Sequence, residues 1–164
     1  MGTQRKEMGV TMLELLVVIA IIGVMTSVAV GVARSLGPEM RLDSAARDIR
    51  SAFQKAKLAA VKKNADCLVV FDTTSPGSYQ ACIDADASDS CDTGEEVIAE
   101  KDFSDYPNIS LTGASFTSGD YIQFNSRGST GSIMGWSAGS VNCTNARGEM
   151  KTITVTRTGE ININ

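Results

Sequence analysis

The first strong pattern along the chain is an uncharged apolar run that follows a short polar start. It extends from Leu15 to Ala33, nineteen residues that are mostly Leu, Val, Ile, Ala and Gly. At about 1.5 Å per residue, roughly 20 residues of helix cross the ~30 Å apolar core of a bilayer. A cleaved signal peptide is the alternative, since Arg5 and Lys6 precede the run, but its apolar region spans only ~7–15 residues. The pattern favours a retained transmembrane helix over about residues 13–33.

A second apolar pattern follows with the period of a helix. Apolar residues recur at three- and four-residue spacing, which defines one helix face: Leu42, Ala45, Ile49, Ala52, Phe53, Ala56 and Ala59. This face predicts packing against the rest of the protein and requires no cofactor site. Pro38, after Gly37, lacks an N–H and clashes with the preceding turn, so a kink or break is expected there. Residues 10–63 therefore form one long, bent N-terminal stem.

After Lys63 the period changes to that of β-strands. Short β-like runs are separated by Gly, Pro-Gly and Asp/Ser clusters; they span residues 67–71, 78–83, 96–103, 109–112, 121–126, 132–136 and 150–156. The tail at 160–163 continues the last run or pairs with it. The sequence therefore predicts an α+β fold. A long, kinked N-terminal transmembrane and stem helix packs on an antiparallel β-sheet globular head formed by residues 64–164.

One carboxylate, Glu14, lies at the edge of the membrane run, within the stretch GVTMLE. An acid at the centre of a membrane helix costs ~2.5–3.5 kcal/mol, so such residues usually have a partner. If the chain were cut between Gly9 and Val10, the new amino group, with a pKa of ~7.7–8.0, would lie one helical turn from Glu14. That amine would pair with Glu14 of its own or a neighbouring subunit. The simpler alternative is an interfacial carboxylate that reaches the lipid headgroups.

This N-terminal stretch resembles the class III signal of type IV pilins and type II secretion pseudopilins. The likeness rests on a basic leader, a hydrophobic residue after the glycine, and an apolar helix, with Gly9, Val10, Thr11, Leu13 and Glu14 at the family positions. It implies that prepilin peptidase removes residues 1–9 as a leader and methylates Val10, and that Glu14 directs assembly. The family's first mature residue is commonly Phe or Met, so Val10 is a departure.

The closing strands extend the resemblance. FNSRGSTGSI followed by ITVTRTGEINI is similar to the GspH/FimT group of minor pilins and pseudopilins. The resemblance implies a pilin fold and a structural subunit of a type IV pilus or a type II secretion pseudopilus, acting in filament assembly or initiation. It implies a single-pass bacterial inner-membrane protein with a periplasmic head, later a filament subunit. The implied partners are other pilin or pseudopilin subunits, prepilin peptidase, an inner-membrane assembly platform and membrane lipid.

Charge bears on the alternative function, FimT-like DNA binding in natural transformation. The net charge of −4 hides +5 in residues 1–63 and −9 in residues 64–164. Some FimT proteins take up DNA through arginines in a Gly-Arg-x-Arg turn, but Gly159 here begins the sequence GEIN, which lacks both. The candidate DNA contacts are Arg127, Arg147, Lys151 and Arg157. Phosphate neutralisation supplies most non-specific affinity, so the acidic head disfavours DNA.

The four cysteines, Cys67, Cys82, Cys91 and Cys143, contain no CxxC pair. A head exported to an oxidising compartment would keep paired cysteines as disulfides. Four cysteines allow three connectivities. Cys82 and Cys91 bracket an acidic loop and would close it, leaving Cys67 for Cys143. Free buried thiols are the alternative.

The acidic loop at 84–95 is the one candidate for metal binding. Asp84, Asp86, Ser88 and Glu95 stand at positions 1, 3, 5 and 12 of an EF-hand-like loop. Position 6 is Asp89 instead of the glycine that the sharp turn requires, and flanking helices are absent from the pattern. The sequence therefore favours a solvated acidic loop without a metal.

Composition disfavours catalysis. The chain contains no histidine, which excludes Ser-His-Asp and Cys-His mechanisms. No other nucleophile–base motif is apparent. We therefore expect no catalytic residues, no cofactor and no enzymatic activity.

Overall fold

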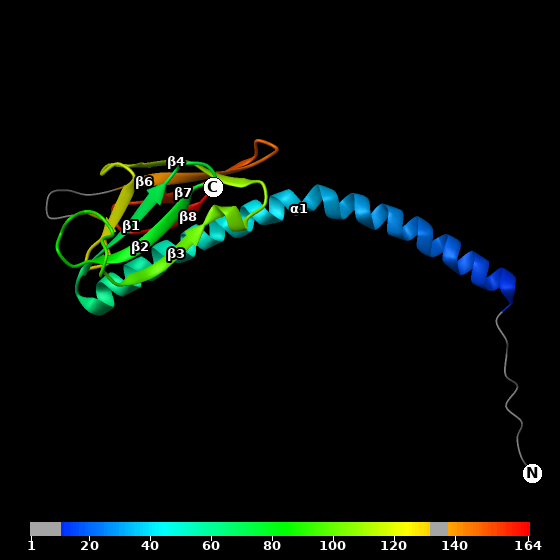
Figure 1. The fold of residues 1–164 in the computed structure, drawn as a ribbon, viewed down its shortest axis with the longest axis horizontal. Helices are drawn as coiled ribbons and strands as arrows, with labels where there is room; N and C mark the ends of the chain where they lie inside the picture. Colours follow the sequence, from blue (N-terminus) through cyan, green and yellow to red (C-terminus); the bar gives the residue numbers. More distant parts are fainter. Residues whose placement is uncertain (1–10, 132–137) are drawn as a thin grey trace, which may run out of the picture. The chain divides into compact units, whose positions relative to one another are not determined.

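The computed structural model describes residues 11–131 and 138–164, without the side chains of residues 31–35. One helix, α1 (Met12–Lys63), is followed by eight strands and the short 3-10 helix η1 (Phe103–Asp105) in the described residues (Figure 1). The chain divides into two compact units between Gly37 and Pro38. Helix α1 runs without interruption through Pro38. Of the kink or break expected there, the break is therefore absent and the kink stays a prediction. Proline lacks one backbone hydrogen bond, but the turns on either side keep theirs, so the helix can continue.

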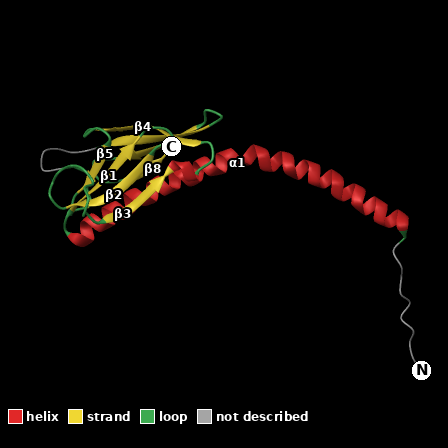
Figure 2. Ribbon diagram, in the orientation of Figure 1, coloured by secondary structure: helices red, strands yellow, loops and turns green. Residues whose placement is uncertain are grey.

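The strands form two four-stranded sheets, drawn in yellow in Figure 2. Their bounds are β1 (Asp66–Asp72), β2 (Ser78–Asp84), β3 (Val97–Asp102), β4 (Ile109–Phe116), β5 (Tyr121–Phe124), β6 (Gly139–Asn145), β7 (Met150–Val155) and β8 (Ile161–Ile163). One sheet has the order β3-β2-β1-β5 and the other the order β4-β6-β7-β8. Every pairing is antiparallel. The predicted α+β fold with an antiparallel head is confirmed.

Most of the predicted strands coincide with observed ones, and the tail at 160–163 contributes β8. The predicted run at 132–136 lies outside the described residues. Strand β6 was missed, because its sequence GSVNCTN is largely polar. Only Val141 and Cys143 supply the apolar alternation of this strand, too short a signal against polar neighbours.

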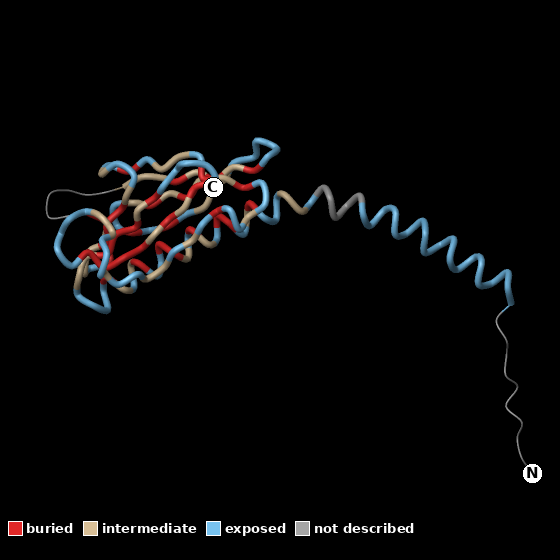
Figure 3. The backbone as a smooth tube through the Cα atoms, in the orientation of Figure 1, coloured by how far each residue is buried: buried red, intermediate tan, exposed pale blue. Residues whose placement is uncertain are grey.

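The core of the head lies between the second half of α1 and the two sheets. The ring centroid of Phe53 in α1 lies 5.7 Å from that of Phe71 in β1, 6.3 Å from that of Phe116 in β4 and 6.2 Å from that of Phe124 in β5. The predicted face is buried at Leu42, Ala45, Ile49, Ala52, Phe53 and Ala56. Ala59 is only half-buried. Figure 3 shows this buried stripe in red along the helix. The small alanine side chains let the helix lie close to the sheets, and Phe53 contacts rings from both sheets.

Polar contacts hold the same half of α1 against the head. The Tyr106 hydroxyl donates a hydrogen bond to the Asp48 carboxylate. Lys57 Nζ donates to the backbone carbonyl of Gly159 at 2.9 Å. These contacts specify the rotation of the helix on the sheets, which apolar burial alone leaves less defined.

Candidate functional site

The first candidate is the apolar segment, Met12–Val30, which begins α1. Its 19 residues have a mean hydropathy of 2.6, and none of this window is buried. Within the described residues it is the one helix long and apolar enough to cross a membrane. Thr26 Oγ1 donates to the carbonyl of Ile22 and Ser27 Oγ to that of Val24, both at 2.7 Å. The two hydroxyls are therefore satisfied within the helix, as an apolar environment demands.

The helix begins at a side-chain cap. Thr11 Oγ1 accepts the backbone N–H of Glu14 at 3.2 Å, the contact of a Thr-x-x-Glu capping box. The Glu14 carboxylate lies in the first turn, where the helix dipole favours negative charge. It is exposed and forms no ion pair with another residue of the described chain. Gly9 and Val10, the predicted cleavage and methylation positions, lie outside the described residues.

The second candidate is the acidic loop between β2 and β3. The predicted Cys82–Cys91 disulfide is present, with an S–S distance of 2.01 Å and Cα atoms 5.7 Å apart. It fastens the loop to strand β2. Carboxylate oxygens of Asp84, Asp86 and Glu95 all lie within 4.8 Å of one another. The loop that the sequence singled out therefore brings three acids together.

Backbone N–H groups organise these acids. The N–H of Ser88 donates to Oδ1 of Asp84 and to Oδ1 of Asp86, each at 3.1 Å. Glu95 Oε1 accepts from the N–H of Ala85 at 2.8 Å. Asp89 has a left-handed φ of 60°, so an aspartate makes the turn for which the sequence pattern requires glycine.

Asp84 departs from the predicted solvated loop. It ends β2, is paired with Asp66 of β1, and is only 7% exposed. Its Oδ2 atom is buried without a hydrogen-bond partner among the described residues. Burial is the largest influence on the pKa of Asp84 and raises it; the N–H of Ser88 lowers it, and the charge of Glu95 raises it. The solvated-loop prediction is wrong for this residue, because the strand carries it into the head.

The second predicted disulfide is wrong. Cys67 and Cys143 are free, buried thiols. Cys67 lies on β1 and Cys143 on β6, strands that belong to different sheets and are not neighbours. Burial raises the pKa of Cys67 to about 12 and that of Cys143 to about 11. Both side chains are therefore core residues.

The structure divides the four candidate DNA contacts. Arg127 and Arg157 line one cavity of about 490 Å³ together with Lys57. Arg147 lies in the turn between β6 and β7, whereas Lys151 forms a 3.2 Å ion pair with a helix carboxylate. Sequence reasoning missed Lys57 as a neighbour of the two arginines, because it comes from the helix far upstream in the chain. Arg147 and Lys151 are not among the residues that line this cavity.

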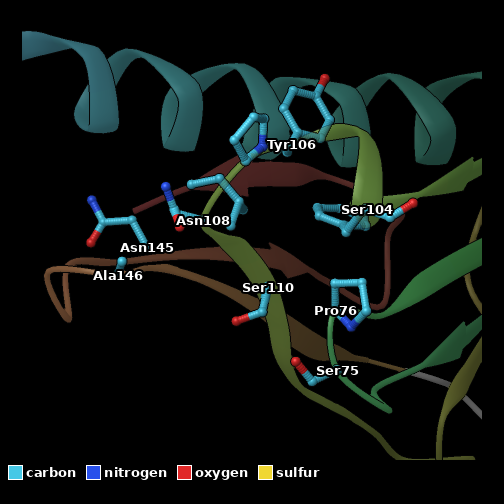
Figure 4. Close-up of a pocket in the computed structure, with 11 residues that line it drawn as sticks. Ser75, Pro76, Ser104, Tyr106, Asn108, Ser110, Asn145 and Ala146 are labelled. Atoms are coloured by element: carbon cyan, nitrogen blue, oxygen red, sulfur yellow. The ribbon is translucent and has the colours of Figure 1, made fainter.

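A further cavity of about 390 Å³ lies between the β1–β2 turn, the segment after η1 and the end of β6 (Figure 4). Polar groups of Ser75, Tyr106, Asn108 and Asn145 are among those around it. None of its described lining residues is an acid, a base or a cysteine. These lining residues therefore include no nucleophile–base pair. No sequence motif predicted the cavity.

Comparisons with known proteins agree with this architecture. The family model described as "Type II transport protein GspH" matches residues 45–159. The "Pilin-like protein PilA1" of Thermus thermophilus is 36% identical over 89 residues, which are 54% of this chain and 55% of that protein. The chain thus spans about half the length of this curated relative.

A solved structure provides the comparison of folds. The type IV minor pilin FimU of Pseudomonas aeruginosa superposes with a TM-score of 0.53 and 15% identity. The match covers 77% of this chain and 90% of that one. The chain therefore has the fold of a minor pilin. Because the family model spans most of the chain, from the second half of α1 to the turn before β8, the chain belongs to the GspH family of type II transport proteins.

Proposed function

We propose that this chain is a minor pilin or pseudopilin, a structural subunit of a type IV pilus or a type II secretion pseudopilus. Its role is filament assembly or initiation. The observation that carries the proposal is the exposed 19-residue apolar segment with one carboxylate in its first turn. An apolar surface of this extent needs lipid or other apolar helices around it. Membership of the GspH family supports neighbouring subunits as the second environment.

The proposed life cycle begins in the bacterial inner membrane. The apolar segment anchors the chain in a single pass, with the β head in the periplasm. Prepilin peptidase removes residues 1–9 and methylates Val10. An inner-membrane assembly platform then moves the subunit from lipid into the filament, where the apolar segments of neighbouring subunits replace the lipid. The chain performs no catalysis in this cycle and needs no cofactor.

Glu14 directs docking in this proposal. In the membrane, its position in the first turn keeps the carboxylate close to the headgroups. In the filament, the carboxylate would lie among apolar helices, where an unpaired charge is strongly penalised. Only a neighbour whose amino terminus has the correct register would satisfy it. The absence of an ion pair to Glu14 within the described chain is compatible with a partner from another subunit.

Processing can be tested by mass spectrometry of the protein isolated from its host. The expected mature N-terminus is Val10, carrying a methyl group. An intact leader, or a cut near Ala33, would contradict the filament proposal, because the apolar segment would then be either blocked or lost.

Docking can be tested with Glu14→Leu and Glu14→Gln. Both variants are expected to be inserted and cleaved, because the peptidase signal centres on Gly9. Their incorporation into sheared filaments should fall at least about tenfold, a loss of ~1.4 kcal/mol or more, for the charge attraction that neither side chain supplies. Glu39→Leu makes the matched change at an exposed carboxylate later in the same helix. Quantitative blotting of filament and inner-membrane fractions measures the result, and normal incorporation of Glu14→Leu contradicts the docking role.

DNA binding is not part of this proposal. Of the predicted contacts, Arg127 and Arg157 line the cavity beside Lys57, and Lys57 already donates to the Gly159 carbonyl. Residues 64–164 carry a net charge of −9, which repels the DNA backbone.

A further inference from the structure

The acidic loop holds an arrangement that filament assembly does not use. Asp84, Asp86 and Glu95 converge so that one carboxylate oxygen from each lies within 4.8 Å of the others. None of the three forms an ion pair in the described chain, where the ion pairs join Lys63 to Glu96, Lys101 to Asp105, and Lys151 to Asp43. Three neighbouring carboxylates repel one another unless a positive charge lies among them.

The buried oxygen of Asp84 is the independent indication of a ligand. Asp84 is 7% exposed, and its Oδ2 has no hydrogen-bond partner among the described residues. Its other oxygen is held by the N–H of Ser88, which also holds Asp86. A buried carboxylate oxygen without a donor costs free energy, and buried charges in proteins are usually paired or coordinate a metal ion.

We propose that Asp84, Asp86 and Glu95 form a calcium-binding site in the connection between β2 and β3, which the Cys82–Cys91 disulfide fastens to β2. The donors are all carboxylate oxygens, which hard cations prefer. Each carboxylate retains acceptor capacity beside its N–H contacts, because every oxygen has two lone pairs. Water and loop carbonyl groups complete the six to eight ligands that calcium takes.

Coordination preferences favour calcium over magnesium at this loop. Two oxygens on opposite sides of one calcium ion lie about 4.6–5.2 Å apart, twice the Ca–O distance of 2.3–2.6 Å. The three carboxylate oxygens lie within 4.8 Å of one another, so one calcium ion can contact all three. Magnesium demands a near-ideal octahedron and dehydrates reluctantly, whereas calcium accepts irregular sets of carboxylate ligands. The Cys82–Cys91 disulfide restrains rearrangement of the loop segment that carries Asp84 and Asp86.

The test is calcium titration of the full chain, purified in detergent with its disulfide intact and freed of metal with a chelator. Calorimetry is expected to find one site per chain with a Kd of about 0.1–1 mM, the range of extracellular calcium modules. Magnesium should bind at least about tenfold more weakly, because it demands near-ideal octahedral geometry and dehydrates reluctantly. At 10 mM calcium the Tm should rise by about 5 °C, since the ion binds only the folded site.

Asp86→Asn and Glu95→Gln identify the ligands. Asp86→Asn keeps an acceptor oxygen for the N–H of Ser88, and Glu95→Gln keeps one for the N–H of Ala85 but loses the acceptor of the Asp92 N–H. Each variant loses one charge, so calcium affinity should fall at least about tenfold. Glu100→Gln removes one exposed charge from β3 and should change the affinity less than about twofold. The Tm without calcium shows whether each variant is folded.

Three outcomes would overturn the proposal. The first is the absence of saturable calcium binding at 10 mM. The second is equal affinity for magnesium, a wild-type measurement that depends on no variant. The third is an equal loss of affinity in Glu100→Gln and the two ligand variants, which would indicate diffuse charge screening. None of these results bears on Glu14 or on filament assembly, so the two proposals fail separately.

Discussion

The two halves of α1 place apolar side chains in opposite environments. In Met12–Val30 the helix is apolar almost throughout, and all of it is exposed. In the second half the helix is more polar, yet one face is buried at Leu42, Ile49 and Phe53. The more apolar half is therefore the unburied one, which reverses the usual relation between hydrophobicity and burial. The difference shows that one half finds its apolar partner within the chain, whereas the other must find it outside.

The kinds of side chain differ in the same way. The exposed half presents large aliphatic residues on every side, among them Leu16, Ile19 and Ile22. The buried half contacts the sheets mainly through alanines, with Phe53 among three other rings. An all-round aliphatic surface accepts lipid or another helix, because apolar burial is non-directional. A helix face of alanines around one aromatic ring packs closely only against a surface of matching shape, here the two sheets of the head.

The largest expected effect concerns the tightness of the head core, measured at Cys67 and Cys143. At pH 8, iodoacetamide should modify both thiols about 100- to 1000-fold more slowly than an exposed cysteine, because burial raises their pKa to about 12 and about 11. After denaturation without reductant, mass spectrometry should find two alkylated thiols and one intact disulfide. As the exposed reference, Ser115→Cys places a thiol at an exposed position of β4 and should react at the rate of a free cysteine. Rapid native labelling of Cys67 would show that the core is open.

The next effect compares truncations in the two halves. Phe53→Ala removes a fully buried ring and should lower the free energy of unfolding of the head by about 3–5 kcal/mol. Val17→Ala is the matched truncation in the exposed half and should change it by less than about 0.5 kcal/mol. Urea denaturation in detergent, followed by circular dichroism, measures both. Similar losses in the two variants would remove the distinction between the halves.

A smaller effect concerns the polar contact that only the buried half makes. Tyr106→Phe removes the hydrogen bond to Asp48 and should cost about 1–2 kcal/mol, as expected for a bond to a charged acceptor. Tyr121→Phe is the control, because the Asp89 carboxylate beside its hydroxyl is exposed, and it should cost less than about 0.5 kcal/mol. The same denaturation experiment measures the free energy of unfolding of both variants. An equal loss in the two would mean that the hydrogen bond to Asp48 does not hold the helix to the head.

The smallest effect is expected at Gly23, in the exposed half. An added Cβ there would meet open space, so Gly23→Ala should change the stability of the head by less than about 0.5 kcal/mol. Gly139→Ala is the contrast, since its Cβ would lie 2.1 Å from the carbonyl oxygen of Ser115 and should cost about 1–3 kcal/mol. Thermal unfolding measures both, and a large loss in Gly23→Ala would show that the apolar segment contributes to the folding of the head.

Local patterns in the sequence were sufficient for most of the fold. The helical spacing around Phe53 located the buried face of α1, and alternating runs located most strands, because both periods appear within a few turns or residues. Strand β6 was not recognised, since its two apolar residues are too few to outweigh polar neighbours. Its pairing with β4 and β7 supplies the stability that its own sequence does not indicate.

Among the candidate sites, the features that depend on nearby residues were also predictable, and those that depend on strand order were not. The Cys82–Cys91 bond was predictable, because nine positions of sequence separation keep the two residues close whatever the rest of the fold. The proposed pairing of Cys67 with Cys143 failed because it depended on which strands are neighbours. The burial of Asp84 also escaped the sequence, which marked the whole loop as acidic and could not show that β2 carries its first residue into the head.

The sequence by itself determined that an apolar helix begins the chain, that Glu14 lies in its first turn and that an antiparallel head follows, because each depends on residues close together in the chain. Only the tertiary structure decided that Phe53 meets rings from both sheets, that Arg127 and Arg157 share a cavity with Lys57, and that two cysteines remain apart. Those contacts depend on the order and registry of strands far apart in the chain. Strand order is a property of the whole fold, and no local period encodes it.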